Sequence, residues 1–148
     1  MVRWAVVALL TLVAGCAGKS EPLRTDAGVS ADLSAADWSQ AETVDVTATE
    51  FEFGPSQLRF DREHLYHLRL RNSGGVGHSF SAPAFFASAA LRDDPASAEL
   101  RTGGGTIELA SGQTVDVYFQ PQRAGTFPLQ CTHPLHSTFG MTGEIVVE

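Results

Sequence analysis

The feature of this chain that most restricts its fold is a period-two alternation of apolar and polar side chains that begins at Val44. Such alternation places every second side chain on the same face of a β-strand, so that one face can be buried. Residues typical of turns separate the runs, at 72–75, 111–112 and 122–125. Short strands with frequent turns predict an all-β sandwich or barrel. The apolar members of the runs are Val44, Val46 and Ala48; Tyr66, Leu68 and Leu70; Ile107 and Leu109; Val115, Val117 and Phe119; Phe127, Leu129 and Cys131; and Ile145 and Val147 in the closing run.

Two segments depart from this pattern. Phe51 and Phe53 continue the first run one residue out of phase. This slip reverses the two faces and predicts a β-bulge or kink near residues 49–50. Residues 84–105 do not alternate: residues 84–92 look weakly helical, whereas 93–95 and 103–105, with their Pro and Gly, look like loop. We therefore expect a short helical or loop excursion between strands around 84–105.

The start of the chain has the composition of an export signal. A positive charge precedes an apolar run over residues 4–13, which is too short to span a bilayer. The sequence that ends at Cys16 resembles the cleavage site of bacterial lipoproteins, in which the Cys carries the lipid. We predict a signal peptide over residues 1–15, lipidation of Cys16, a tether over 16–42 and one folded domain over 43–148. The alternative is an ordinary signal peptide in which Cys16 has no such role.

Net charge and cysteine count narrow the possible functions. The chain carries −7 at neutral pH with His neutral, and removal of the signal with its Arg3 makes this −8. Such an acidic protein is a poor partner for nucleic acid or for an anionic membrane surface. Its two cysteines are Cys16 and Cys131. If Cys16 is lipidated, Cys131 is a lone thiol in an exported protein and is open to oxidation unless a metal occupies it. The alternatives are a disulfide between Cys16 and Cys131, or a buried free thiol at Cys131.

The C-terminal segment gathers residue types that bind a soft metal. Cys131, His136 and Met141 follow one another at intervals of five residues, and a second imidazole, His78, lies on a separate segment upstream. Two His and one Cys with a weak Met ligand make the blue, type 1 copper site. Thiolate and thioether suit Cu(I), and imidazole suits both oxidation states. This set of residues therefore tolerates a one-electron change.

Residues 44–148 resemble the cupredoxins. The spacing of Cys131, His136 and Met141 is similar to that of rusticyanin-type cupredoxins, and residues 124–131 are similar to the strand that leads to the family's Cys. The resemblance implies a Greek-key β-sandwich or barrel with one type 1 copper ion. It further implies that Cys131, His78 and His136 are the strong ligands and Met141 the weak axial one. A weak fifth contact from the carbonyl of Gly77 is part of the same expectation.

Two further residues, Ser79 and His133, lie close in sequence to the expected ligands. Many cupredoxins have an Asn after the first ligand His, where it joins the two ligand loops, and this chain has Ser79. A hydroxyl can make the same bonds with a shorter reach, which bears on loop rigidity and on the reduction potential. His133 lies two residues after Cys131. The simplest interpretation of His133 is an exposed loop residue. The alternatives are a group that contacts a ligand, a group whose protonation changes the reduction potential of the site, or a competing ligand.

These observations predict a one-electron carrier of the cell envelope, a monomer attached to a membrane only through its lipid and working with redox partner proteins. A periplasmic copper-delivery protein is the alternative, but Met1 and Met141 are the only methionines, so the chain has no Met-rich tail. We do not expect an enzyme. Multicopper oxidases have His on both sides of the ligand Cys, and here the neighbours are Gln130 and Thr132. A binuclear CuA centre needs a second Cys in the loop, which this chain lacks.

Overall fold

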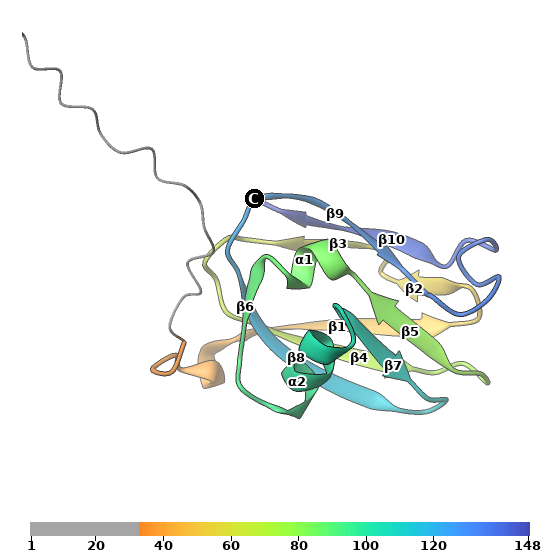
Figure 1. Ribbon diagram of the computed structural model, residues 1–148, viewed down its shortest axis with the longest axis horizontal. Helices are drawn as coiled ribbons and strands as arrows, with labels where there is room; N and C mark the ends of the chain where they lie inside the picture. Colours follow the sequence, from red (N-terminus) through yellow and green to blue (C-terminus); the bar gives the residue numbers. More distant parts are fainter. Residues whose placement is uncertain (1–32) are drawn as a thin grey trace, which may run out of the picture.

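The computed structural model describes residues 33–148, which form two β-sheets packed face to face (Figure 1). One sheet has the strand order β2-β1-β4-β8-β6 and the other β3-β10-β9-β5-β7. This confirms the predicted all-β sandwich. The strands are β1 (Glu42–Thr49), β2 (Glu52–Gly54), β3 (Gln57–Phe60), β4 (Tyr66–Asn72), β5 (His78–Ser81), β6 (Ala89–Leu91), β7 (Thr106–Leu109), β8 (Thr114–Pro121), β9 (Gly125–Gln130) and β10 (Thr142–Val147). The helices are the 3-10 turn η1 (Trp38–Gln40), α1 (Pro83–Phe86) and α2 (Pro95–Thr102).

Most pairings in the sheets are antiparallel, but two are parallel. β1 lies parallel to β4, and β3 lies parallel to β10. Parallel neighbours cannot be joined by a tight hairpin, so the chain crosses between the sheets to make these pairs. Within residues 33–148, none of the helices is long and apolar enough to cross a membrane.

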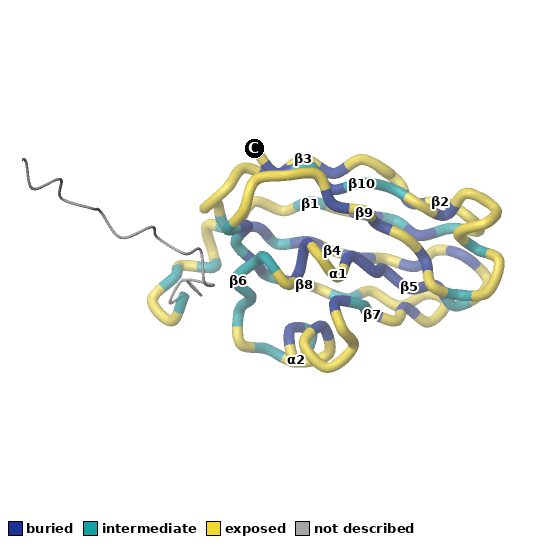
Figure 2. Tube along the Cα trace, turned by 45° about the horizontal axis from the view of Figure 1, so that its top comes forward, coloured by how far each residue is buried: buried dark blue, intermediate teal, exposed yellow. Residues whose placement is uncertain are grey.

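The core includes the inward-facing side chains that the alternation predicts. Leu68 and Leu70 on β4 and Val117 and Phe119 on β8 are completely buried. Phe85 of α1 packs on Phe119 with a ring-centroid distance of 5.2 Å, so this short helix adds to the same core. Burying each large apolar side chain stabilises the fold by roughly 1.5–3 kcal/mol. Figure 2 shows that β5 is buried along its length, whereas buried and less buried residues alternate along β4 and β8.

The prediction of a β-bulge or kink near residues 49–50 was wrong. The chain instead reverses there: β1 ends at Thr49 and pairs antiparallel with β2, with Thr49 opposite Glu52. Phe51 occupies the turn with φ 67°, a conformation that is uncommon for a bulky residue. The change of phase therefore marks two strands joined by a tight turn, so Phe53 faces the core while Phe51 remains exposed.

The excursion around 84–105 has more regular structure than its sequence suggests. It contains the short helix α1, the edge strand β6 and the helix α2. The segment around Asp94 was expected to be loop, but its side chain accepts a hydrogen bond from the N–H of Ser97 at 2.9 Å and Pro95 occupies the first helical turn. An Asp cap followed by Pro starts a helix, which is why the loop interpretation failed here.

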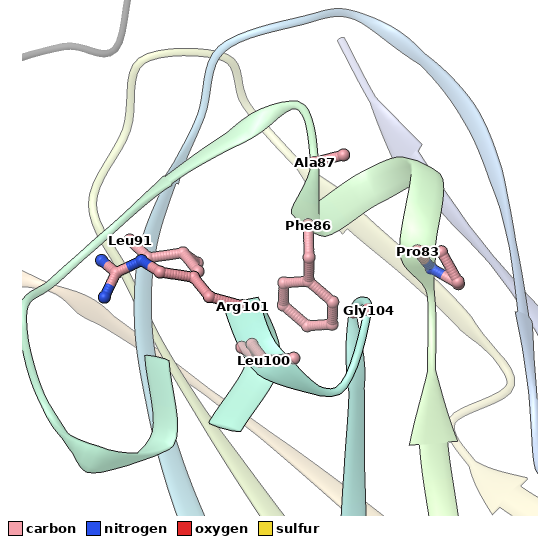
Figure 3. Close-up of a pocket in the computed structure, with 8 residues that line it drawn as sticks. Pro83, Phe86, Ala87, Leu91, Leu100, Arg101 and Gly104 are labelled. Atoms are coloured by element: carbon pink, nitrogen blue, oxygen red, sulfur yellow. The ribbon is translucent and has the colours of Figure 1, made fainter. Parts of the chain in front are cut away.

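A cavity of about 360 Å³ lies beside this excursion, between α1, β6 and α2 (Figure 3). Its lining is mostly apolar and includes Phe86, Leu91 and Leu100, with Arg101 as its one charged residue. None of the predicted copper ligands lines it.

Two segments carry the predicted ligands: the loop over residues 131–141 between β9 and β10, and the end of the loop before β5 with the first residue of β5. They meet at one end of the sandwich, on the right in Figure 1, where the β1–β2 turn also lies. η1, among the first described residues, lies at the opposite end. The fold therefore separates the predicted site from the point where the tether would enter the domain.

Candidate metal centre

His78 is the first residue of β5, and the segment before it is held by a buried asparagine. His78 pairs with Leu109 of β7 and is completely buried. The amide of Asn72 donates to the carbonyls of Val76 and Leu109, both at 2.8 Å, and its oxygen accepts from the N–H of Gly74 at 2.9 Å. Asn72 thus joins the end of β4, the loop that leads to His78 and the end of β7.

Cys131 directly follows β9 and is also completely buried. Its sulfur accepts from the backbone N–H of Ser79 at 3.4 Å and from the Ser79 hydroxyl at 3.8 Å. The same hydroxyl accepts from the N–H of Thr132 and lies 2.8 Å from the Thr132 hydroxyl. Ser79 therefore bonds to both the thiol and the second ligand loop, as expected for a residue in the place of the family's Asn.

The loop over residues 131–141 closes on itself. The N–H of Cys131 donates to the carbonyl of Met141 at 3.0 Å, and the N–H of Met141 donates to the carbonyl of His136 at 3.0 Å. Leu135 and Gly140 have φ of 70° and 105°, which lets the chain turn sharply around His136. Met141 is completely buried at the end of this loop, immediately before β10.

Three of the four predicted ligands form one cluster. A donor atom of each of His78, Cys131 and His136 lies within 4.8 Å of the other two. The Nδ1 atoms of the two imidazoles are 3.1 Å apart, and the Cys131 sulfur is 3.5 Å from Nδ1 of His136. Among residues 33–148, no carboxylate belongs to this cluster. The donors are therefore two imidazole nitrogens and one sulfur, from two separate segments.

This donor set fits a copper ion. In the absence of a metal, the two facing Nδ1 atoms can share only one proton, which one donates to the other. A cation between them can accept the lone pairs of both nitrogens. Burial lowers the pKa of His78, and the charge of His136 lowers it further. His78 is therefore neutral near neutral pH, which is the form of imidazole that binds a metal. A soft sulfur and two imidazoles suit copper, whereas Mg²⁺ and Ca²⁺ prefer oxygen ligands.

His133 lies beside this cluster and is not part of it. Its Nε2 is 2.8 Å from a carboxylate oxygen of Glu108 on β7, and its ring centroid is 5.4 Å from that of His136. The side chain is about one-third exposed. This arrangement favours the interpretation of His133 as a neighbour of the ligands over that of a competing ligand. A Cβ placed on Gly77 would lie 3.3 Å from the His133 ring, so Gly77 leaves room for that imidazole.

Sequence reasoning missed three residues at this end of the molecule. Phe51 packs edge-on against His136 with ring centroids 5.3 Å apart, Asn72 fixes the loop before His78, and Glu50 accepts from the N–H of Gly75. The phase change at Phe51 was a visible signal, but it pointed to a bulge. Cys16, the predicted lipidation site, lies outside the described residues.

A β-sandwich whose end loops gather two imidazoles and a thiol, with a buried Met closing the same loop, is a type 1 copper protein of the cupredoxin class. A family model described as copper binding proteins of the plastocyanin/azurin family matches residues 40–148. The chain therefore belongs to this family, and its cofactor is copper.

Solved structures agree on the fold. A sodium dithionite-reduced auracyanin from the photosynthetic bacterium Roseiflexus castenholzii is 15% identical, with a TM-score of 0.53 over 73% of this chain and 98% of its own. Auracyanin B is 23% identical, with a TM-score of 0.52 over 73% of this chain and 89% of its own. At these identities the similarity shows the fold alone. No curated protein matches the chain in sequence.

Proposed function

We propose that this protein is a one-electron carrier in which His78, Cys131, His136 and Met141 hold a single copper ion. The observation that carries the proposal is the convergence of two imidazole nitrogens and one thiol sulfur, with His78 and Cys131 completely buried and His136 partly buried. Bound copper supplies reversible exchange of one electron. Gly77, which directly precedes His78, is proposed to place its carbonyl as a weak fifth contact.

The protein's own groups keep this donor set fixed. Ser79 bonds to the Cys131 sulfur and to Thr132, and Asn72 holds the loop before His78. The complete burial of His78 and Cys131 excludes water from these two donors. A rigid set of ligands needs little rearrangement between two oxidation states, which favours rapid electron transfer.

Electrons are proposed to pass through the edge of His136, which apolar side chains surround. Among the described residues, the exposed large apolar side chains are Phe51, Val76, Leu135 and Phe139, from 40% to 63% exposed. Phe51 contacts the rings of both His136 and Phe139. An exposed apolar patch of this kind suits brief docking with a redox partner protein.

The second candidate, copper delivery, is favoured by no further observation on this chain. Enzyme activity is not proposed, because Gln130 and Thr132 stand where a multicopper oxidase has its bridging His residues. We further propose that a signal peptide over residues 1–15 exports the protein to the cell envelope, that Cys16 carries the lipid and that residues 16–42 tether a monomeric domain over 43–148. The placement of η1 opposite the metal site supports this arrangement, since the site would face away from the anchor.

A redox titration of the copper-loaded protein tests the proposed function. We expect a reversible one-electron transition followed by visible absorption. Met141→Leu is expected to keep the blue colour and to raise the reduction potential, because loss of a weak donor destabilises Cu(II) more than Cu(I). An irreversible titration would contradict the carrier function. A lower potential in Met141→Leu, or loss of copper, would show that Met141 is not a weak axial ligand.

Acidic substitutions in the apolar patch test the docking surface. Leu135→Asp and Phe139→Asp are expected to slow electron exchange with a partner, or between copies of the protein, while the visible spectrum stays unchanged. Thr126→Asp adds the same charge to an exposed position at the other end of β9 and serves as the control. Equal rates in all three variants, measured by stopped-flow absorption, would place the docking surface elsewhere and favour delivery over electron transfer.

A further inference from the structure

The imidazole of His78 has one nitrogen that the proposed copper site does not use. Its Nδ1 faces His136, whereas its Nε2 is buried and has no hydrogen-bond partner. Buried polar atoms are nearly always paired, so an unpaired one calls for an explanation. When Nδ1 binds a metal, Nε2 must carry the proton, and this N–H needs an acceptor.

A carboxylate lies close to this unpaired nitrogen. Glu50 is in the β1–β2 turn, and its Oε1 accepts from the N–H of Gly75. A Cβ built on the buried Gly74 would lie 2.8 Å from Oε1 of Glu50 and 3.0 Å from Nε2 of His78. The two polar atoms therefore flank the same small space, which is open because residue 74 has no side chain.

The Glu50 side chain is suited to an acceptor role. The hydrogen bond from the Gly75 N–H is the main cause that lowers the pKa of its carboxyl, so the group is anionic near neutral pH. One bond to Gly75 leaves further lone pairs on the carboxylate. Glu50 is exposed, which gives its side chain freedom to rotate toward His78.

We propose that Glu50 is the positioning residue of His78: its carboxylate accepts the Nε2–H, directly or across one water, and so directs Nδ1 toward the copper. Its negative charge also stabilises Cu(II) relative to Cu(I). The inference rests on the proposed ligand role of His78. It also gives Gly74 a function, because any side chain there would separate the two groups.

The test compares three variants that separate charge from contact. Glu50→Gln removes the charge and keeps an amide oxygen. Gly74→Ala keeps the charge and inserts a methyl group between Glu50 and His78. Glu52→Gln removes one charge from an exposed site on the neighbouring strand and is the control. Loss of such an outer contact typically weakens metal binding 10- to 100-fold.

We expect Glu50→Gln and Gly74→Ala each to weaken Cu(II) binding roughly 10-fold or more, with less than about a 2-fold effect in Glu52→Gln. If Cu(I) binding is unchanged, a 10-fold loss raises the reduction potential by about 59 mV. In the copper-free protein, nitrogen-15 NMR should show His78 as the Nε2–H tautomer, with a slowly exchanging proton whose protection falls in Glu50→Gln.

Equal potentials in Glu50→Gln and Glu52→Gln would overturn the proposal, as would an Nδ1–H tautomer of His78 in the copper-free protein. Failure of the proposed copper site itself is a different result. If His78 is not a ligand, His78→Ala keeps the blue colour. If only the role of Glu50 is wrong, His78→Ala bleaches the protein while Glu50→Gln leaves the affinity and potential of the wild type.

Discussion

Cys131→Ser is expected to abolish the blue colour of the copper-loaded protein while the β-sandwich stays folded. The colour arises from charge transfer between a thiolate sulfur and Cu(II), and a hydroxyl oxygen is neither soft nor ionised at neutral pH. The core strands do not depend on the sulfur. We expect the free energy of unfolding of the copper-free protein to fall by about 1–3 kcal/mol, because a hydroxyl replaces a completely buried thiol. Visible absorption and thermal unfolding by circular dichroism measure the two effects.

His133→Ala is the matched control for this loss of colour. It removes an imidazole two residues from Cys131 whose Nε2 pairs with Glu108, and it should leave the absorption spectrum nearly unchanged. A colourless His133→Ala protein would mean that the loop supplies His133 to the copper in place of His136. A Cys131→Ser protein that remains blue would refute the type 1 site altogether.

The candidate ligand set could be proposed from sequence because its chemistry is local. Cys131, His136 and Met141 share one loop, so their spacing alone indicates a soft-metal site. His78 lies on another segment, so only its residue type suggested it, and its ligand role was implied by the resemblance to a family. The structure brings it to Cys131 and His136 through the pairing of β5 with β7 and β9. The alternation likewise predicted β1, β4 and β7–β10, since a buried face requires an apolar residue at every second position, but it did not indicate β3, β5 or β6.

The groups around the ligands could not be predicted because their contacts are long-range. Glu50 approaches His78 only because β1 and β2 form a hairpin at that end of the sandwich. Phe51 reaches His136 for the same reason, across the gap between the two sheets. Neither contact has a spacing rule in the sequence. The alternation changes phase after Thr49, but a β-bulge and a reversal of the chain both produce such a change, so the sequence pattern did not distinguish them.

Asn72→Ala is expected to have the largest effect on stability of any single change at this end of the molecule. The variant loses two bonds to the carbonyls of Val76 and Leu109 and one from the N–H of Gly74, and it leaves these backbone groups without their partner. The bonds to the Leu109 carbonyl and from the Gly74 N–H are buried, and each unpaired buried group costs about 1–3 kcal/mol, so we expect a total loss of about 2–6 kcal/mol. Denaturant unfolding of the copper-free protein measures it.

The same change should also act on the copper site, because Asn72 fixes the loop that leads to His78. A loosened His78 binds Cu(II) more weakly, so Asn72→Ala should reduce Cu(II) affinity as well as stability. Leu100→Ala, in α2 and 2% exposed, is the control. It should cost a similar 2–5 kcal/mol, roughly, through a cavity in the core, and leave copper affinity and reduction potential unchanged. If both variants change affinity equally, the effect of Asn72 comes from general destabilisation; if neither does, Asn72 supports the fold and not the position of His78.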